Sequence, residues 1–295
     1  MTDKLLLGLW KGNRIMSAFE PHRADDLRVH VYAVCWNEEQ ILPFFLRYYS
    51  AFAERIVVYD NESTDASPEI IRRWPGAELR RFSTNGVFDD RANLQIKNTS
   101  YRDSLGLADF VIVVDIDEIV YHPQIAEVLM QYKRQGVTLP RTRGFDMVSW
   151  RFPRAQGQIV DLVNLGCASN EYSKRCVFDP SIGINFELGC NTCKPEGPVV
   201  ENTGAELSLL HYHYLGLLRC ILRHRRVRDR LAAAAFQTKT GYQFRWGPAK
   251  IAGRFANYRV NANDVINNRR SLLSLSFGPV LNLAKGFYWK HKKRW

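Results

Sequence analysis

The stretch Asp109-Phe110-Val111-Ile112-Val113-Val114-Asp115-Ile116-Asp117-Glu118 decides the fold. Its five consecutive apolar residues are mostly β-branched, which predicts a strand buried on both faces, as in a parallel sheet. Three carboxylates follow within four residues, at Asp115, Asp117 and Glu118. Because Asp115 and Asp117 are two apart in an extended chain, their side chains leave on one face and can direct oxygens at one hard cation. Open α/β sheets bind ligands at the carboxyl ends of such strands, so we expect a cation and a diphosphate there.

The segments before this stretch alternate between strand and helix. The residue pattern predicts strands over 29–35, 55–59, 78–82 and 110–114, and helices over 40–52, 68–74, 90–107 and about 124–135. Such alternation predicts an α/β fold with a mostly parallel sheet flanked by helices. Polar clusters follow the first two strands, at 37–39 and 60–62, on the same sheet edge as Asp115. Acidic groups gathered in this way are unfavourable unless a cation or hydrogen-bond donors satisfy them.

The chain is basic, with 41 Lys and Arg against 30 Asp and Glu and a net charge of +11 in 295 residues. This balance fits a nucleic acid, an anionic membrane or a phosphorylated small molecule as the partner. We expect no nucleic acid partner, because no recognition helix or single-strand-binding signature accompanies the charge. The excess lies at 219–230 and 290–294, where a solvated face and a contact with phosphate or anionic lipid are both open interpretations.

The compartment is predicted from what the sequence lacks. Residues 1–20 lack the charged start, the long apolar core and the small-residue cleavage site of a secretory signal. We therefore expect the six cysteines in a reduced cytoplasmic setting. No apolar run approaches the ~20 residues of a membrane-spanning helix. The segment 271–295 mixes apolar and aromatic residues with a basic end, which predicts either docking on the core or peripheral contact with the inner face of an anionic membrane.

In order and spacing, these motifs resemble the GT-A enzymes of glycosyltransferase family 2, in the branch with a short NEE first loop and a DxDE metal motif. The resemblance covers about residues 28–215 and implies a GT-A-type, Rossmann-like fold. In that family the first two strands and their loops hold the nucleotide base and ribose. The matching residues here are Asn37, Glu38, Asp60, Asn61 and Glu62.

The resemblance also implies a diphosphate site and a divalent ion, Mn²⁺ or Mg²⁺. Lys97 and Asn98 match the element that faces the diphosphate. Asp115 and Asp117 match the metal-binding motif; Asp117 is the first choice for direct coordination, and Asp115 would contact the ribose and a metal-bound water. Glycosyl transfer releases a nucleoside diphosphate, and a divalent ion neutralises the charge that grows on it.

A third metal ligand in GT-A folds often comes from a histidine in the second half of the domain. His211 and His213 lie in the segment Leu210-His211-Tyr212-His213-Tyr214, where alternate positions of a strand put both on one face. A structural role in the core is equally open for either histidine alone. The nearby arginines of 219–230, Arg219 above all, are candidates for binding the donor phosphate.

An inverting mechanism needs a carboxylate that takes the proton of the acceptor hydroxyl. The Glu-Asp acceptor signature of the family is not evident in this chain. Glu187 and Asp179 are the predicted candidates, with Asp146 and Glu171 behind them, and a structural role is open for each. Glu187 leads because it lies between an apolar segment and a Gly-Cys-Asn turn after the predicted acceptor region.

Together these observations predict an N-terminal extension at 1–27, a nucleotide-sugar-binding half at 28–123, an acceptor-binding half at 124–247 and a basic, aromatic, helical tail at 248–295. The predicted function is metal-dependent, inverting transfer of a hexosyl group from a nucleotide-diphosphate sugar to a glycan or lipid-linked acceptor, in surface polysaccharide synthesis. The alternative is a non-catalytic module, or transferase relic, that binds a glycan or a membrane surface and holds a structural divalent ion.

Overall fold

The computed structural model describes residues 27–154, 156–203, 206–231 and 242–269. The predicted extension, apart from residue 27, and the tail beyond residue 269 lie outside these ranges. The described part of the tail forms helix α7 (Pro248–Asn261) and strand β12 (Asn263–Asp264). Both belong to the body of the protein, because α7 packs on α6 and β12 pairs with β7.

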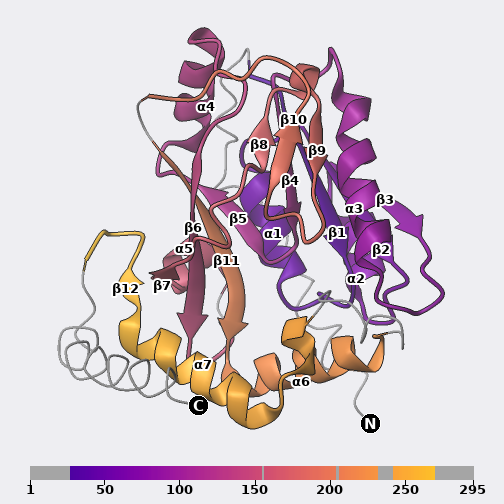
Figure 1. The fold of residues 1–295 in the computed structure, drawn as a ribbon, viewed down its shortest axis with the longest axis vertical. Coiled ribbons are helices and arrows are strands. Elements are labelled where there is room, and N and C mark those ends of the chain that lie inside the picture. Colours follow the sequence, from indigo (N-terminus) through magenta and orange to yellow (C-terminus); the bar gives the residue numbers. More distant parts are fainter. Residues whose placement is uncertain (1–26, 155, 204–205, 232–241, 270–295) are drawn as a thin grey trace, which may run out of the picture.

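The first sheet has five strands in the order β3-β2-β1-β4-β8 (Figure 1). They are β1 (Val29–Cys35), β2 (Arg55–Asn61), β3 (Ala77–Phe82), β4 (Phe110–Asp115) and β8 (Val177–Phe178). The first four in the chain pair in parallel, whereas β8 is antiparallel to β4. Val34 lies opposite Asp115 and Cys35 opposite Asp60, so the carboxyl ends of three strands meet at one edge. The predicted α/β fold with a parallel sheet is confirmed.

A second sheet, which the sequence pattern did not define, has the order β12-β7-β6-β11-β5. Its longer strands are β5 (Glu118–Tyr121), β6 (Thr142–Ser149), β7 (Leu165–Ala168) and β11 (Leu207–Leu215), and β9 (Ile184–Phe186) forms a separate hairpin with β10 (Cys193–Pro195). Of its described pairs, only β6 with β11 is parallel, so the expectation of a mostly parallel sheet is wrong for this half. The turn at Ile116 and Asp117 separates β4 from β5 and thereby joins the two sheets.

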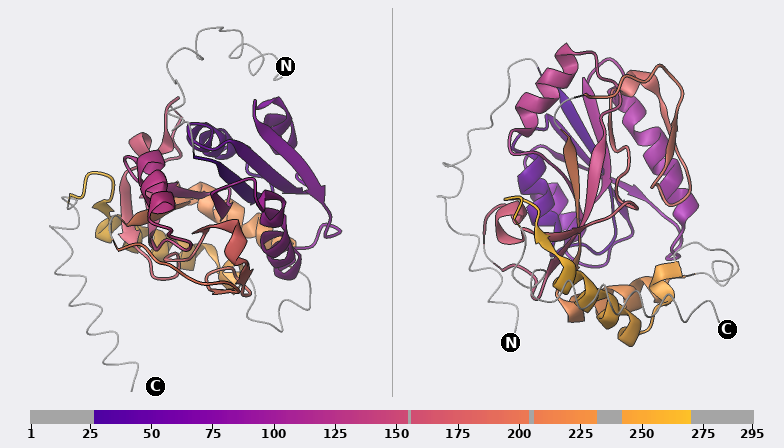
Figure 2. Two further views of the ribbon diagram at one scale, coloured as in Figure 1. Left: turned by 90° about the horizontal axis from the view of Figure 1, so that it is seen from above. Right: turned by 60° about the vertical axis from the view of Figure 1, so that its left-hand side comes forward.

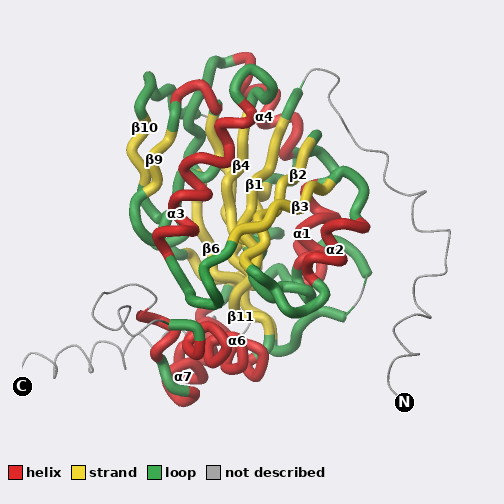
Figure 3. Tube along the Cα trace, turned by 90° about the vertical axis from the view of Figure 1, so that its right-hand side faces the viewer, coloured by secondary structure: helices red, strands yellow, loops and turns green. Residues whose placement is uncertain are grey.

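Helices cover both faces of the first sheet (Figure 3). The helices on one face are α1 (Leu42–Tyr49) and α2 (Ser67–Arg73), with α4 (Ile125–Arg134) in the same hydrophobic cluster; the other face carries α3 (Asp90–Thr99) and the 3₁₀ turn η2 (Ser100–Ser104). Asp89 begins α3 by accepting hydrogen bonds from the N–H groups of Arg91 and Ala92. The helix predicted over 90–107 is shorter because the chain tightens into η2 and then turns at Gly106, whose φ is +71°.

Two helices close the end of the molecule toward which β6 and β11 run (Figures 1 and 2). They are α6 (Leu217–Asp229) and α7; the remaining short elements are α5 (Ile159–Leu162), η3 (Pro180–Ile182) and η5 (Tyr242–Arg245). The N–H of Gly216 donates to the carbonyl of Ser149 at 2.9 Å, and the N–H of Phe88 donates to the carbonyl of Arg230 at 2.9 Å. The start of α6 is therefore held to strand β6, and its end to the loop between β3 and α3, by backbone hydrogen bonds.

The predicted membrane contact rests largely on residues outside the described ranges. Among the residues that the structure describes, no helix is long and apolar enough to cross a membrane. Helix α6 exposes Leu218 and Leu222, and Arg225 on the same helix is also exposed. The segment 271–295 is not described, so peripheral contact with a membrane stays a prediction.

Gly144 lets the segment that follows β7 approach strand β6 closely. A Cβ at this position would overlap the backbone carbon of Tyr172 and lie 2.5 Å from the nitrogen of Ser173. The close approach brings the ring of Tyr172 against that of His211, with 3.8 Å between centroids, and carries Lys174 to the buried carboxylate of Glu118. The absence of a side chain at Gly144 thus shapes the region described next.

We expect Gly144→Ala to lower the free energy of unfolding by roughly 2–3 kcal/mol, because backbone atoms cannot move aside as a flexible side chain would. Gly253→Ala on α7 is the matched control, since nothing lies within 4 Å of the added methyl, and its better helix propensity should raise stability by up to about 1 kcal/mol. Urea unfolding followed by circular dichroism measures both; equal midpoints for Gly144→Ala and the parent would contradict the packing described.

Candidate active site

A cavity of about 820 Å³ lies at the carboxyl ends of β1 and β4. Its wall includes Asn37 and Glu38 after β1, Asp115 at the end of β4, and residues of α3, β11, α6 and η5. Binding pockets in proteins commonly measure about 300–1,000 Å³, so a ligand of nucleotide size fits. Open α/β sheets bind their ligands at this edge, and the sequence predicted a ligand site at the carboxyl ends of these strands.

Three of the four predicted metal ligands come together in this cavity. Asp117 lies in the turn between the sheets, and His211 and His213 lie two apart on β11. The Nε2 of His211 is 3.5 Å from Oδ2 of Asp117, and the Nδ1 of His213 is 3.7 Å from the same oxygen. One ligand atom from each residue falls within 4.8 Å of the others, and all three residues are buried. Asp115 is not in this group.

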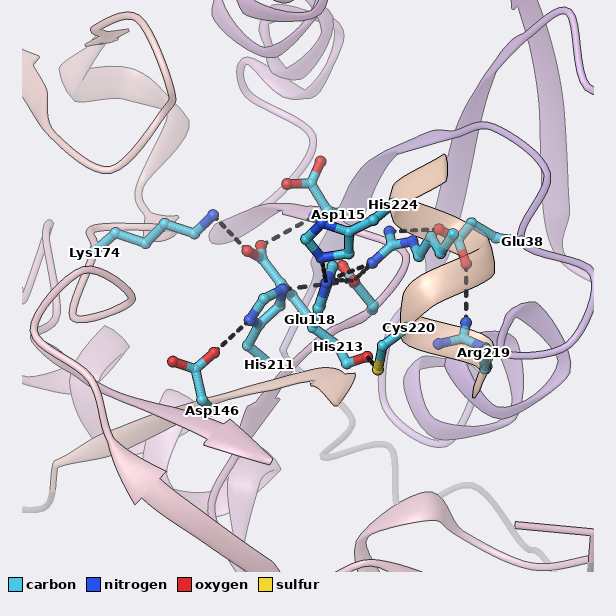
Figure 4. Close-up of polar contacts among 12 residues, drawn as sticks. Glu38, Asp115, Glu118, Asp146, Lys174, His211, His213, Arg219, Cys220 and His224 are labelled. Atoms are coloured by element: carbon cyan, nitrogen blue, oxygen red, sulfur yellow. Dashed lines mark hydrogen bonds and ion pairs between the residues drawn. The ribbon is translucent and has the colours of Figure 1, made fainter. Parts of the chain in front are cut away.

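Asp146 fixes the orientation of His211. Its Oδ1 lies 2.8 Å from the Nδ1 of His211 (Figure 4), and its Oδ2 accepts a hydrogen bond from the hydroxyl of Tyr258 at 2.8 Å. The Nε2 of His211 therefore faces Asp117. A carboxylate behind the imidazole is the usual partner of a metal-binding histidine. Burial lowers the pKa of His211, but the carboxylates of Asp117 and Asp146 outweigh burial and raise it to about 10.

His213 is held in one neutral tautomer. Its Nδ1 lies 2.5 Å from Nη1 of Arg223, and its Nε2 lies 3.0 Å from Nε2 of His224. Because a guanidinium can only donate, Nδ1 must accept, and the ring proton of His213 is therefore on Nε2 and points at His224. Burial and the charge of Arg223 lower the pKa of His213 to about 3, so the imidazole is neutral at physiological pH.

Arg223 bridges two buried carboxylates. Its Nη1 donates to Oδ2 of Asp117 at 2.6 Å, and its Nη2 donates to Oε1 of Glu38 at 2.5 Å. Burial acts to raise the pKa of Asp117, but Arg223 and His211 hold it well below its usual range. The predicted phosphate ligand Arg219 instead lies over the ring of Phe152 and pairs with Glu38 at 3.4 Å (Figure 4), outside the cavity wall.

Two buried lysines line the same cavity. The Nζ of Lys97 is 2.7 Å from Oδ1 of Asp115, and the Nζ of Lys174 is 2.6 Å from Oε1 of Glu118 (Figure 4). The lysines are 5% and 4% exposed, whereas the side chain of Asp115 is 43% exposed. The pairing with Lys97 explains why Asp115 stands apart from Asp117 and the histidines, although both aspartates were predicted to hold the ion.

The two loops predicted to hold a nucleotide divide into cavity residues and supporting residues. Asn37, Glu38 and Asn61 line the cavity. Asp60 is buried behind it; its Oδ2 accepts from the N–H of Ser63, and its Oδ1 has no hydrogen-bond partner among the described residues. Glu62 accepts hydrogen bonds from the hydroxyl of Ser83 and the N–H groups of residues 84 and 86, so it fixes a neighbouring loop.

Three other predicted residues do not reach the cavity wall. Asn98 exchanges two hydrogen bonds with the backbone of Phe186 and ties α3 to the β9 strand. Glu187 points outward to Lys194 at 2.8 Å. Asp179 accepts from the N–H of Ser181 and caps η3. The carboxylates of Glu187 and Asp179 thus contact the hairpin and a helical turn outside the cavity wall, and the catalytic role predicted for them stays a prediction.

Two carboxyl groups that line the cavity, those of Glu171 and Asp90, are candidates for proton transfer. Glu171, one of the lesser candidates from the sequence, is exposed at the cavity, whereas Asp146 is engaged by His211 and Tyr258. Asp90, which sequence reasoning missed, is the first residue of α3, and burial and the nearby charge of Asp115 raise its pKa to about 6. A cavity carboxyl group with a pKa close to neutrality can both accept and return a proton.

Sequence reasoning missed Lys174, and among the arginines near His213 it put Arg219 first. Arg223 lies four residues after Arg219, so helical spacing puts the two on one face of α6, but of this pair it is Arg223 that lines the cavity. No comparable signal marks Lys174, whose position depends on the close approach at Gly144.

Comparisons with known proteins place the chain in no family: no protein-family model and no curated protein matches it. Among solved structures, S. aureus TarS 1–349 shares 11% identity over 78% of this chain and 71% of that chain, with a TM-score of 0.36. A glucosyl-3-phosphoglycerate synthase from Mycobacterium tuberculosis, in complex with Mn²⁺, uridine diphosphate and glucosyl-3-phosphoglycerate, shares 20% identity over 41% of this chain and 45% of that chain, with a TM-score of 0.28. At these values the likenesses assign no activity to the chain.

In the ion-free protein, kept so by EDTA, we expect His211 to stay protonated to about pH 10 and His213 to stay neutral to about pH 3. Against the ordinary pKa of 6.5, His211 adds stability that is complete below pH 6.5 and is lost as the pH rises toward 10. The lowered pKa of His213 has the opposite sign, so stability falls as the pH drops from 6.5 toward 3.

Asp146→Asn should lower the pKa of His211, because one of its two carboxylate partners becomes neutral, and Glu171→Gln should leave it unchanged. NMR titration of the imidazole nitrogens measures these values. A pKa for His211 that is the same in the parent and in Asp146→Asn would contradict the orienting role of Asp146.

Proposed function

We propose that the protein is a metal-dependent glycosyltransferase that moves a sugar from a nucleoside-diphosphate sugar to a glycan or lipid-linked acceptor. The observation that carries this proposal is the meeting of Asp117, His211 and His213 with three cationic side chains, those of the buried Lys97 and Lys174 and the partly buried Arg223, at the carboxyl edge of a parallel sheet. A carboxylate with two imidazoles suits a divalent ion, and buried cations suit the phosphates of a leaving nucleotide. The GT-A type of fold and the family 2 branch belong to the same proposal.

The donor set fits a divalent ion. Asp117 offers a carboxylate oxygen, His211 its Nε2 and His213 its Nδ1, while Asp146 supports His211 from behind. Two nitrogen ligands favour Mn²⁺ over Mg²⁺, because Mg²⁺ binds mainly oxygen. When bound, such an ion neutralises negative charge on the diphosphate leaving group. Asp115, held by Lys97, is proposed to contact the donor instead of the ion.

Other cavity residues are proposed to bind different parts of the donor. Lys97, Lys174 and Arg223 are proposed to bind the diphosphate, whose charge grows as the glycosidic bond breaks. Asn37 and Asn61 are proposed to hold the nucleoside. Trp36 lies in the same wall under the guanidinium of Arg230, at 4.1 Å from the ring centroid, and offers a flat face to a base.

The function is tested by thermal shift with UDP, GDP, CDP and dTDP, each with Mn²⁺ and with EDTA. We expect one nucleotide with Mn²⁺ to raise the melting temperature by about 5 °C or more at about 100 times its Kd. Asp117→Asn should abolish the shift, whereas Glu187→Gln, which changes a carboxylate outside the cavity, should retain it. Incubation with the corresponding nucleotide sugars then measures turnover.

Binding of ion and nucleotide without any turnover would favour the alternative, a non-catalytic glycan- or membrane-surface-binding module with a structural ion. No binding by an intact, folded protein would contradict the proposed function outright.

Inversion requires a base, and we propose Asp90 for that role with Glu171 as the competing residue. Both line the cavity, and the pKa of about 6 keeps Asp90 close to the operating pH. Asp90→Asn should lower kcat by about 10²-fold or more without weakening nucleotide binding, and Glu171→Gln should leave kcat within a few-fold. The reverse pattern would assign the base to Glu171, and the anomeric configuration of the product, read by NMR, tests inversion itself.

A further inference from the structure

We propose that Arg223 is the resident cation of the ion site: it pairs with Asp117 and His213 in the ion-free protein and moves to the donor diphosphate when the ion is bound. Ion and nucleotide then bind as a coupled pair, each weak without the other. This inference rests on the proposed function and concerns the order and coupling of binding at the same site.

Arg223 already contacts two of the three candidate ligands. Its Nη1 is 2.6 Å from Oδ2 of Asp117 and 2.5 Å from Nδ1 of His213. Asp117 is 3% and Glu38 7% exposed, and Arg223 is the cation that contacts both of these buried carboxylates, beside His211 at Asp117 and Arg219 at Glu38. A buried carboxylate without a partner is strongly unfavourable. In the ion-free protein Arg223 therefore supplies part of the positive charge that a divalent ion would bring to Asp117.

The contact with His213 makes the two cations mutually exclusive. A neutral imidazole has one lone pair, and the proton of His213 is on Nε2, where it faces His224 at 3.0 Å. The lone pair of Nδ1 is therefore the one that accepts from Arg223, and it is the same lone pair that an ion would need. Arg223 has to release His213 before that nitrogen can hold an ion.

A released Arg223 needs a new anionic partner. The guanidinium is planar and rigid, so Nη1 leaves Asp117 when the whole group pivots about Nη2, which can keep its bond to Glu38. Arg223 lines the cavity together with Lys97 and Lys174, so a diphosphate bound there offers oxygens within its reach. A guanidinium binds phosphate in a planar, two-pronged geometry. Without that anion, an ion and a displaced buried guanidinium would repel each other.

Two residues of helix α6 contact the two ring nitrogens of His213. Arg223 faces Nδ1 of His213, and the next residue, His224, faces Nε2 of the same ring. The Sγ of Cys220 donates to the carbonyl of His213 at 3.3 Å. One helix therefore fixes the ring that Arg223 engages, and Arg223 can move without freeing His213 to rotate.

The test measures Mn²⁺ binding by electron paramagnetic resonance at pH 7.5, with and without saturating pyrophosphate or the nucleotide found above. For the parent we expect weak binding of Mn²⁺ alone and at least tenfold tighter binding with the anion. For Arg223→Gln we expect Mn²⁺ alone to bind at least tenfold tighter than in the parent, and the enhancement by the anion to fall at least tenfold. The remaining enhancement comes from direct contact of Mn²⁺ with phosphate.

Arg225→Gln is the matched control, because Arg225 is exposed on the same helix and does not line the cavity; it should bind Mn²⁺ as the parent does. If Arg223→Gln does not fold, Arg223→Lys replaces it: a single ammonium cannot hold Asp117, His213 and Glu38 together, so the same direction is expected with a smaller change. Equal Mn²⁺ affinity with and without the anion in the parent would overturn the inference with no variant at all.

Asp117→Asn separates this inference from the proposed function. If Asp117→Asn loses Mn²⁺ while Arg223→Gln binds it no tighter than the parent, the ion site stands and the resident-cation role of Arg223 is wrong. If Asp117→Asn binds Mn²⁺ as the parent does, the ion site is elsewhere, and both the proposed function and this inference fail.

Discussion

The buried carboxylate of Asp117 needs opposite charge, and much of the structure is arranged to provide it. Asp117 lies in the turn that joins the two sheets, so it cannot turn to solvent without disturbing both. Its own backbone carbonyl accepts from the N–H of Tyr212 at 2.7 Å, which fastens the turn to β11. The same strand contributes His211 and His213, and α6 contributes Arg223. Asp117 therefore lies both in the turn that joins the sheets and at the centre of the network of charged side chains.

The sequence predicted the parts of this arrangement that depend on local periodicity. A run of β-branched residues gave β4 its place in the sheet, and the carboxylates after it had to lie at the carboxyl edge. The spacing of two between His211 and His213 was enough to put both on one side of a strand. Burial by helices on both faces followed from the alternation of strand and helix. Each of these inferences needs only a few neighbouring residues, which is why they held.

The parts that the sequence did not define depend on how distant segments meet. Arg223 and Asp117 are 106 residues apart, and no local pattern links them. Asp146 supports His211 only because β6 lies beside β11, a pairing of the second sheet that the sequence did not define. Glu187 was chosen for its place between an apolar segment and a turn, but sequence cannot tell which side of a hairpin faces a cavity. Residue type predicted which chemical groups the site contains, whereas only the fold shows which of these groups contact one another.

The pairing of β11 has a consequence for how this chain can vary in length. His211 lies opposite Glu118 on β5 and opposite Asp146 on β6, so two neighbouring strands fix its register. Loops can gain or lose residues at modest entropic cost. A single residue inserted into or deleted from the first half of β11 would instead turn its side chains to the opposite face and present Tyr212 where the histidines now stand. Relatives with the same chemistry should therefore differ in their loops and keep the length of this strand.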